Sequence, residues 1–197
     1  LTMHEQESEY WDDVAEKVSH PEGFYDNWSK RRLLGQFLLK CSWSRQKVLE
    51  IGVGCGATAS LLSFSCGNRW EYIGTDVSKK FAAIAERLGL KVIQTDVLNL
   101  PEGEFTRILA LDSLEHVHPN DRDVGYREIA KRLSKGGLLF INMPLEDSLH
   151  DDEFDHGIGL SDIVKLESNG LRLQRYEHYS LVSDNINKAY AFVVMTK

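Results

Sequence analysis

One segment near the start of the chain constrains the fold more than any other. The apolar run Lys47–Ile51 stops at three alternate glycines, Gly52, Gly54 and Gly56, and continues into the helix-forming residues 57–62. This order predicts a strand, a tight turn and a helix. Glycine is needed where the backbone takes positive φ or where a ligand lies too close for a Cβ, and a helix that begins there points unpaired N–H groups at the ligand. The turn therefore predicts a nucleotide-type site.

The glycine spacing alone leaves the ligand open, because it also satisfies the dinucleotide fingerprint, with Asp76 at the distance of a ribose-binding acid. Two details favour S-adenosylmethionine. Glu50 stands shortly before the first glycine, where it can reach an ammonium group directly or through water, and Gly56 adds a third alternate glycine. The segment resembles motif I of the class I (Rossmann-like) methyltransferases, Glu/Asp-x-Gly-x-Gly-x-Gly. A glycine turn that binds nothing is the remaining alternative.

Composition limits the partners. The 197 residues, 42% hydrophobic and 27% charged, predict one soluble globular domain, and a formal charge of −7 makes a small-molecule substrate simpler to accommodate than a nucleic acid. Cys41, Cys55 and Cys66 form no Cys-x-x-Cys pair, which predicts reduced thiols. Residues 1–9 lack the features of a leader, and no apolar run approaches ~18 residues. We therefore expect a cytoplasmic monomer or homodimer with no membrane partner.

The residues before the glycine turn are too apolar for a tail. Helical spacing of apolar residues predicts helices within 9–41, broken near Pro21. The family resemblance implies that this region, 1–46, is a helical lid over the cofactor, with four aromatic candidates: Tyr10, Trp11, Tyr25 and Trp28. The alternative is that these aromatic side chains pack an N-terminal helix pair onto the core.

Acidic residues end the next two predicted strands. The run 71–76 resembles motif II, and Asp76, with Val77 beside it, is predicted to bind the cofactor because a carboxylate can accept both ribose hydroxyls. The alternative role, a helix N-cap, is already supplied by Ser78. At the end of the run 91–97, Asp96 and Val97 match the family position that contacts adenine, although Asp96 could instead begin a turn.

The fourth predicted strand, 105–111, ends at Asp112, which we also assign to the cofactor because ligands of open α/β sheets lie beyond the carboxyl ends of the strands. A helix at 121–133, a strand at 138–142, a polar insertion at 143–160, a helix at 161–169 and strands at 171–179 and 189–196 follow. The resemblance implies an α/β fold: a single doubly wound, mostly parallel seven-stranded sheet with an antiparallel C-terminal hairpin, plus N-terminal helices. It implies one methyltransferase domain over 1–197, with a Rossmann-like core at 47–197.

The implied activity is methyl transfer from S-adenosylmethionine to a small molecule, most simply at oxygen, by in-line displacement. His116 or His156 is the predicted general base. Asp112 is followed by Ser-Leu-Glu rather than by the Pro-Pro-Tyr/Phe of base N-methylating enzymes, which disfavours that class. Two alternatives stay open, an RNA 2′-O-methyltransferase and a non-catalytic module that binds S-adenosylmethionine.

A metal site is a further hypothesis. If residues 112–116 form one helical turn, Asp112, Glu115 and His116 share a face. The pattern resembles the Glu-x-x-Glu-His of ubiquinone-pathway O-methyltransferases and of small-RNA 2′-O-methyltransferases, which implies that Glu115, His116 and His156 hold Mg²⁺, Mn²⁺ or Zn²⁺. The first acid is here the shorter Asp, and the alternative is that Glu115 and His116 orient the substrate without a metal.

Overall fold

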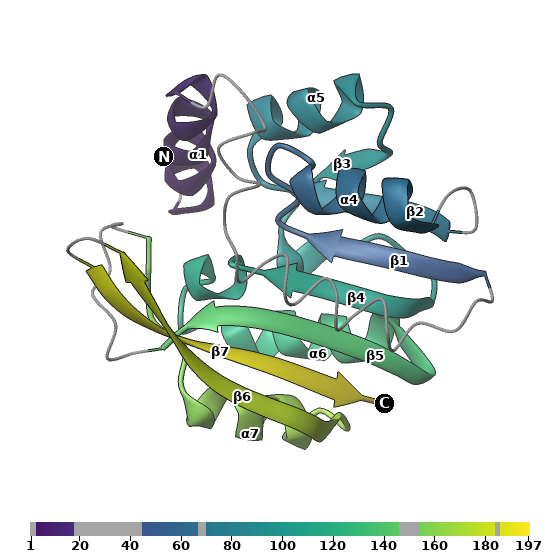
Figure 1. The fold of residues 1–197 in the computed structure, drawn as a ribbon, viewed down its shortest axis with the longest axis vertical. Coiled ribbons are helices and arrows are strands. Elements are labelled where there is room, and N and C mark those ends of the chain that lie inside the picture. The colour runs from purple at the N-terminus through teal and green to yellow at the C-terminus, as the bar shows by residue number, and fades with distance from the viewer. Residues whose placement is uncertain (1–2, 18–44, 67–69, 146–153, 184–185) are drawn as a thin grey trace. The chain divides into compact units, whose positions relative to one another are not determined.

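The structure, a computed structural model, describes residues 3–17, 45–66, 70–145, 154–183 and 186–197 (Figure 1). The chain divides into two compact units, Leu1–Asp96 and Val97–Lys197. None of the helices in the described ranges is long and apolar enough to cross a bilayer. The predicted organisation, one domain with a helical lid at residues 1–46, stays a prediction.

Seven strands form one sheet: β1 (Gln46–Ile51), β2 (Trp70–Asp76), β3 (Val92–Gln94), β4 (Phe105–Leu111), β5 (Leu133–Pro144), β6 (Arg172–Ser183) and β7 (Ile186–Thr196). Their order is β3-β2-β1-β4-β5-β7-β6. β2 pairs in parallel with both β1 and β3, and β4 pairs in parallel with β5. β7 runs antiparallel to β5 and β6, and Figure 1 shows β6 and β7 as the long hairpin near the C-terminus. The predicted mostly parallel sheet with an antiparallel C-terminal hairpin is confirmed.

The first unit contains the strand, turn and helix that the glycine pattern predicts. β1 is buried along almost its whole length, including its polar residues Gln46 and Glu50, and α4 (Ala57–Cys66) begins directly after the glycine turn. α5 (Lys79–Arg87) begins after Ser78, whose Oγ accepts a hydrogen bond from the N–H of Phe81. Ser78 is therefore the N-cap of α5, as the sequence predicts.

The N-terminal helix packs onto the same unit. α1 (Met3–Lys17) lies beside α5 (Figure 1) and begins earlier than the predicted helical stretch. Its Ala15 joins a buried cluster with Cys55 and Phe81, and Trp11 packs against that cluster. The apolar face of α1 is thus used to cover the glycine turn and α5.

The second unit contains the helices α6 (Arg122–Arg132) and α7 (Leu160–Ser168) and the 3₁₀ turns η2 (Val97–Asn99) and η3 (Leu114–His116). The buried side of α6 carries Tyr126, Ile129 and Ala130, as its helical spacing predicts. α7 ends before Gly170, which takes φ +87°, so the predicted helix at 161–169 is confirmed to within one residue at each end.

Strand lengths differ from the sequence-based expectation. β3 covers only Val92–Gln94 instead of 91–97, because it pairs with β2 alone and the chain turns into η2 at Val97. β6 and β7 are longer than predicted, since each continues its pairing with the other through Ser183 and Ile186. Cross-strand pairing of this kind has no local signal in the sequence.

Candidate functional site

The three glycines of the turn all take positive φ, at +72°, +52° and +79° for Gly52, Gly54 and Gly56. A Cβ at Gly54 would meet no other heavy atom of the described residues within 4 Å, so this glycine borders open space. A Cβ at Gly56 would lie 2.8 Å from Leu90 Cδ1, so this glycine is also needed for packing. Gly54 therefore leaves room beside the backbone for a ligand, whereas packing accounts for Gly56, and cofactor binding at this turn stays a prediction.

Asp76 is fixed at the end of β2 by two backbone donors. Its Oδ2 accepts from the N–H of Gly54 at 2.8 Å, and its Oδ1 accepts from the N–H of Ser78 at 2.9 Å. Both donors are parts of the backbone that do not rotate freely, so the carboxylate has one orientation. A fixed carboxylate beside the glycine turn suits recognition of two neighbouring hydroxyls.

Glu50, in β1, is 2% exposed, and its Oε2 accepts a hydrogen bond of 2.5 Å from the phenol of Tyr72 in β2. Burial raises the pKa of Tyr72 well above its ordinary value, and the negative charge of Glu50 raises it further. The phenol therefore stays protonated and donates to Glu50. The predicted contact of Glu50 with a cofactor ammonium stays a prediction.

Polar contacts join α1 to the residues that follow β2. Asp12 Oδ1 accepts from Ser78 Oγ at 2.5 Å and from the N–H of Lys80 at 2.9 Å, and Ser8 Oγ donates to the carbonyl of Val77 at 3.0 Å. The Tyr10 and Trp11 rings meet edge to face, 5.1 Å between centroids.

Of the predicted lid aromatics, Trp11 packs on the core cluster, while Tyr25 and Trp28 lie outside the described residues. The lid role stays a prediction. For Trp11, the observed packing is the one that the alternative, an aromatic contact with the core, describes.

The adenine position falls where the two units join in sequence. Asp96 is half-buried and ends the first unit, while the buried Val97 begins η2 in the second. A Cβ at Gly125 would lie 2.9 Å from Val97 Cγ1, so a glycine in α6 makes room for Val97. Adenine contact by Asp96 and Val97 stays a prediction.

Asp112 does not lie on a helical turn with Glu115 and His116. It takes φ +51°, while the helical residues are only Leu114–His116. Its N–H donates to the carbonyl of Asn142 at 2.9 Å, and its Oδ1 accepts from Asn142 Nδ2 at 2.5 Å. The common-face premise of the metal hypothesis is therefore wrong, because the backbone of β5 holds Asp112 in the left-handed region.

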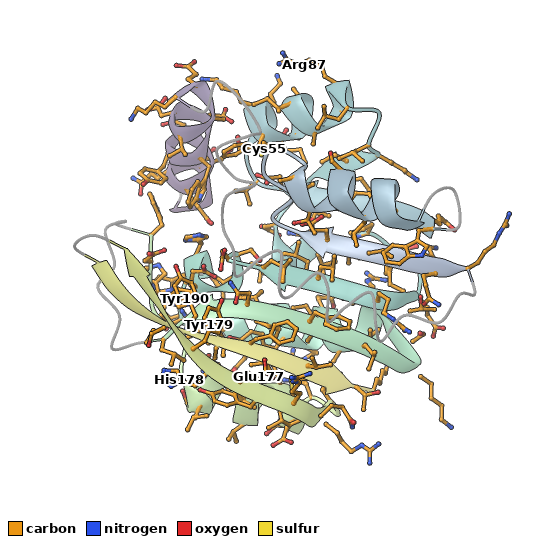
Figure 2. All side chains as sticks on the ribbon, viewed as in Figure 1. Cys55, Arg87, Glu177, His178, Tyr179 and Tyr190 are labelled. Atoms are coloured by element: carbon orange, nitrogen blue, oxygen red, sulfur yellow. The ribbon has the colours of Figure 1, made fainter. Side chains whose placement is uncertain are left out.

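Asn142 also contacts the hairpin. It is fully buried, and its Oδ1 accepts from the phenol of Tyr179 in β6 at 2.5 Å. Tyr179 stacks on Tyr190 of β7, with ring centroids 5.6 Å apart, and Figure 2 shows the two labelled side by side. Burial raises the pKa of Tyr190, and the charges of Asp112 and Glu115 raise it further. A hydrogen-bonded chain thus runs from the hairpin through Asn142 to Asp112.

The insertion after β5 returns to η3, as the predicted grouping of Glu115 and His116 with His156 requires. His116 Nδ1 lies 3.0 Å from Asp155 Oδ1, and the N–H of His156 donates to the carbonyl of Glu115 at 3.0 Å. The rings of His118 and His156 meet edge to face, 5.4 Å apart. Both predicted bases therefore lie in one cluster of the second unit.

The pKa of His156 is lowered from its ordinary value, first by burial and then by His118, Arg122 and His116. His156 is therefore neutral near pH 7, in the protonation state that can accept a proton.

A buried ionic network supports this cluster. Tyr126 donates to Asp162 Oδ1 at 2.9 Å, and Arg122 Nη1 lies 3.4 Å from Asp162 Oδ2. Arg122 Nε donates to the carbonyl of Val117, directly after η3, and Asp162 Oδ2 accepts from the N–H of Gly159. The network ties the residues after η3 to the start of α7.

The described residues do not fit a metal centre. Among them, no group of three or more His, Cys, Asp or Glu side chains converges in the way that a metal ion requires. Glu115 is 3% exposed, its Oε2 has no hydrogen-bond partner among the described residues, and His116 faces Asp155. The geometry therefore does not support Glu115, His116 and His156 as ligands of Mg²⁺, Mn²⁺ or Zn²⁺.

Burial raises the pKa of Glu115 from 4.5 to about 8, with Asp112 and Asp155 adding to the rise and His116 opposing it. Between these values the folded protein keeps a proton that the unfolded chain releases, so the free energy of unfolding falls as pH rises through this window. Glu115→Gln mimics the protonated acid and should flatten that fall. Urea unfolding of both proteins at about pH 5 and about pH 8.5 checks this. An identical loss of stability in both would contradict it.

Comparison with known proteins identifies part of the chain. Residues 48–137 match the family model of a methyltransferase domain. The matched segment is less than half of the chain. It includes the glycine turn, Asp76, Glu115 and His116, but neither the insertion with His156 nor the C-terminal hairpin.

A relative from Methanocaldococcus jannaschii, uncharacterized protein MJ1123, is 37% identical over 103 residues, which are 51% of this chain and 45% of that protein. The chain therefore spans less than half the length of this curated relative.

Two solved structures share the fold of the matched segment and of the strands that follow it. Magnesium protoporphyrin IX methyltransferase (ChlM) from Synechocystis PCC 6803, with bound S-adenosylmethionine, has a TM-score of 0.72 at 14% identity and covers 98% of this chain and 97% of its own. N-methyltransferase NodS from Bradyrhizobium japonicum, in complex with S-adenosylhomocysteine, has a TM-score of 0.69 at 18% identity and covers 93% and 97%. At these identities the likeness establishes the Rossmann-like fold.

Four residues of the site carry no prediction from sequence: Tyr72, Asn142, Tyr179 and Tyr190. Asn142 could have been identified from sequence, since it is a polar residue at the end of an otherwise apolar predicted strand. The tyrosines could not, because their contacts depend on which strands are neighbours and in which register.

Proposed function

We propose that the protein transfers the methyl group of S-adenosylmethionine to an oxygen atom of a small-molecule acceptor. The observation that supports the cofactor most directly is the Asp76 carboxylate, held by the Gly54 N–H beside a turn in which every glycine has positive φ. This geometry lies within the segment that matches a methyltransferase domain. The cofactors named for the two solved structures, S-adenosylmethionine and S-adenosylhomocysteine, agree with it.

In this proposal, some residues bind the cofactor and others align and deprotonate the acceptor. When bound, S-adenosylmethionine supplies a methyl group on a sulfonium, which is already an activated leaving group. Glu50 and Asp76 would hold its ammonium and ribose ends, and the open space at Gly54 leaves room for the nucleoside. Alignment of the acceptor is then the main requirement, with removal of one proton where the acceptor is a hydroxyl.

The oxygen acceptor is supported by the His116–Asp155 pair. With Nδ1 at 3.0 Å from the Asp155 carboxylate, the protonated form of the imidazole would be stabilised, and its Nε2 would take the hydroxyl proton. An amine acceptor that is already neutral needs less help of this kind. The likeness to ubiquinone-pathway O-methyltransferases rests on the Glu115-His116 sequence and belongs to the same proposal.

A neutral or cationic small molecule fits better than RNA. The groups around the two histidines include the carboxyls of Asp112, Glu115 and Asp155, while the neighbouring Arg122 is paired with Asp162. A phosphate backbone would have to approach this cluster and a chain of net charge −7. The non-catalytic binding module has no specific observation in its favour.

A side-by-side transfer assay tests the proposal. The chain is incubated with S-adenosylmethionine labelled in the methyl group and either a metabolite extract or total RNA. We expect labelled product in the extract alone, as a methyl ether or a methyl ester, of which only the ester would release labelled methanol on alkaline hydrolysis. Labelled RNA with a strongly salt-dependent affinity would favour the RNA alternative. S-adenosylhomocysteine binding without any product would favour the binding module.

Transfer should be unchanged in excess EDTA, because the described residues bring no three metal-binding groups together. Initial rates with EDTA, and after addition of Mg²⁺, Mn²⁺ or Zn²⁺, provide the measurement. Activity that is lost in EDTA and regained with one of these ions would overturn the metal-free interpretation.

A further inference from the structure

Tyr72 makes a contact that the proposed function does not use. Its phenol donates to Glu50 Oε2 at 2.5 Å, between the parallel neighbours β1 and β2. The space for the phenol is provided by Gly74, where a Cβ would lie 3.2 Å from the Tyr72 hydroxyl and 3.0 Å from Val53 Cγ2. A larger residue at 74 would therefore push against the hydroxyl or against Val53.

The phenol is placed among negative charges. Glu50 and Asp76 both raise the pKa of Tyr72, which burial raises most. Tyr72 thus lies close to both carboxylates that are predicted to hold the cofactor, and it stays a hydrogen-bond donor at every physiological pH. A donor of this kind stabilises the ionised form of a carboxylate and restricts its rotamers.

We propose that Tyr72 is a positioning residue that sets the carboxylate of Glu50 for the ammonium group of the cofactor's amino acid end. The proposal rests on the proposed function, because it assumes that S-adenosylmethionine binds at this turn. It concerns one part of the ligand only. The nucleoside end, which Asp76 would bind, should not depend on the Tyr72 hydroxyl.

Two ligands separate the ends. S-adenosylhomocysteine carries the ammonium group, whereas 5′-methylthioadenosine has the same nucleoside and lacks the amino acid. Tyr72→Phe should lower the affinity for S-adenosylhomocysteine about tenfold. It should change the affinity for 5′-methylthioadenosine less than about twofold. Calorimetry measures both affinities. Tyr126→Phe is the matched control: it removes another buried phenol donor to a carboxylate, in the second unit, and should lower thermal stability without changing the ratio of the two affinities.

A second variant keeps the test decisive if Tyr72→Phe folds poorly. Glu50→Gln should show the same selective loss for S-adenosylhomocysteine, and the double variant should lose no more than Glu50→Gln alone, because Tyr72 acts through Glu50. Equal losses for both ligands, no loss, or fully additive losses would each overturn the proposal. A native chain that binds neither ligand would instead overturn the proposed function.

Discussion

Replacing His116 by glutamine should lower kcat by about 10²- to 10⁴-fold, the usual contribution of a general base. Glutamine keeps a polar side chain of similar reach but cannot accept a proton. The affinity for S-adenosylhomocysteine should change less than about twofold, because the predicted cofactor contacts are made by Glu50 and Asp76 and not by His116. Steady-state kinetics with the acceptor found in the transfer assay, together with calorimetry, provide the two measurements.

Three further variants test which histidine is the general base. Asp155→Asn should give a smaller loss, since His116 keeps its ring but loses the charge 3.0 Å from Nδ1. His118→Gln is the control for a nearby imidazole that has no proposed role. His156→Gln tests the second candidate. A large loss in His156→Gln with little loss in His116→Gln would move the base to His156.

The pH profile adds an independent criterion. The lowered pKa of His156 means that this imidazole is mostly neutral at pH 6.5, the pKa of an ordinary histidine. A rate that depended on His156 as base would therefore fall at lower pH than a rate that depended on an ordinary imidazole.

The fold was predictable because its signals are local. Strands β1 to β4 are short runs that end at or within two residues of a glycine or an acid, and α5 and α7 each end two residues before a glycine. The hairpin was predicted as two strands, but not its length, because the pairing of Ser183 with Ile186 and of Tyr179 with Tyr190 depends on register. Only contacts between residues that are neighbours along the chain can be predicted from local sequence in this way.

The site shows the same division. Gly54, Asp76 and Ser78 were assigned from one strand end and one turn, and the structure connects them by hydrogen bonds. The shared face of Asp112 and Glu115 was wrong, because it assumed helical φ where Asp112 has φ +51°. The cause is Asn142, 30 residues away, whose amide and carbonyl hold Asp112. A local period cannot foresee a constraint that a distant strand imposes.

Asp76→Ala should weaken the binding of S-adenosylhomocysteine by about 3 kcal/mol or more, which raises its Kd at least about a hundredfold. The predicted contact is bidentate, so the substitution removes two charge-assisted hydrogen bonds to the ribose, each worth about 1.5–3 kcal/mol. Asp96→Ala removes one predicted acceptor at the adenine and should cost about half as much. Calorimetric titration of the native chain and both variants gives the comparison.

The structure adds a complication and a way to resolve it. Asp76 also accepts from the N–H groups of Gly54 and Ser78, so Asp76→Ala leaves two backbone donors without that partner and loosens the turn. Asp76→Asn keeps one carbonyl acceptor of the same shape and should lie between alanine and the native residue. Binding of adenosine and of adenine then distinguishes the predicted ribose contact from the predicted adenine contact. The Asp76 effect should be present with adenosine and small with adenine, which has no ribose, while the Asp96 effect should be present with both. Equal losses for the two variants across both ligands would show that one strand end is misassigned.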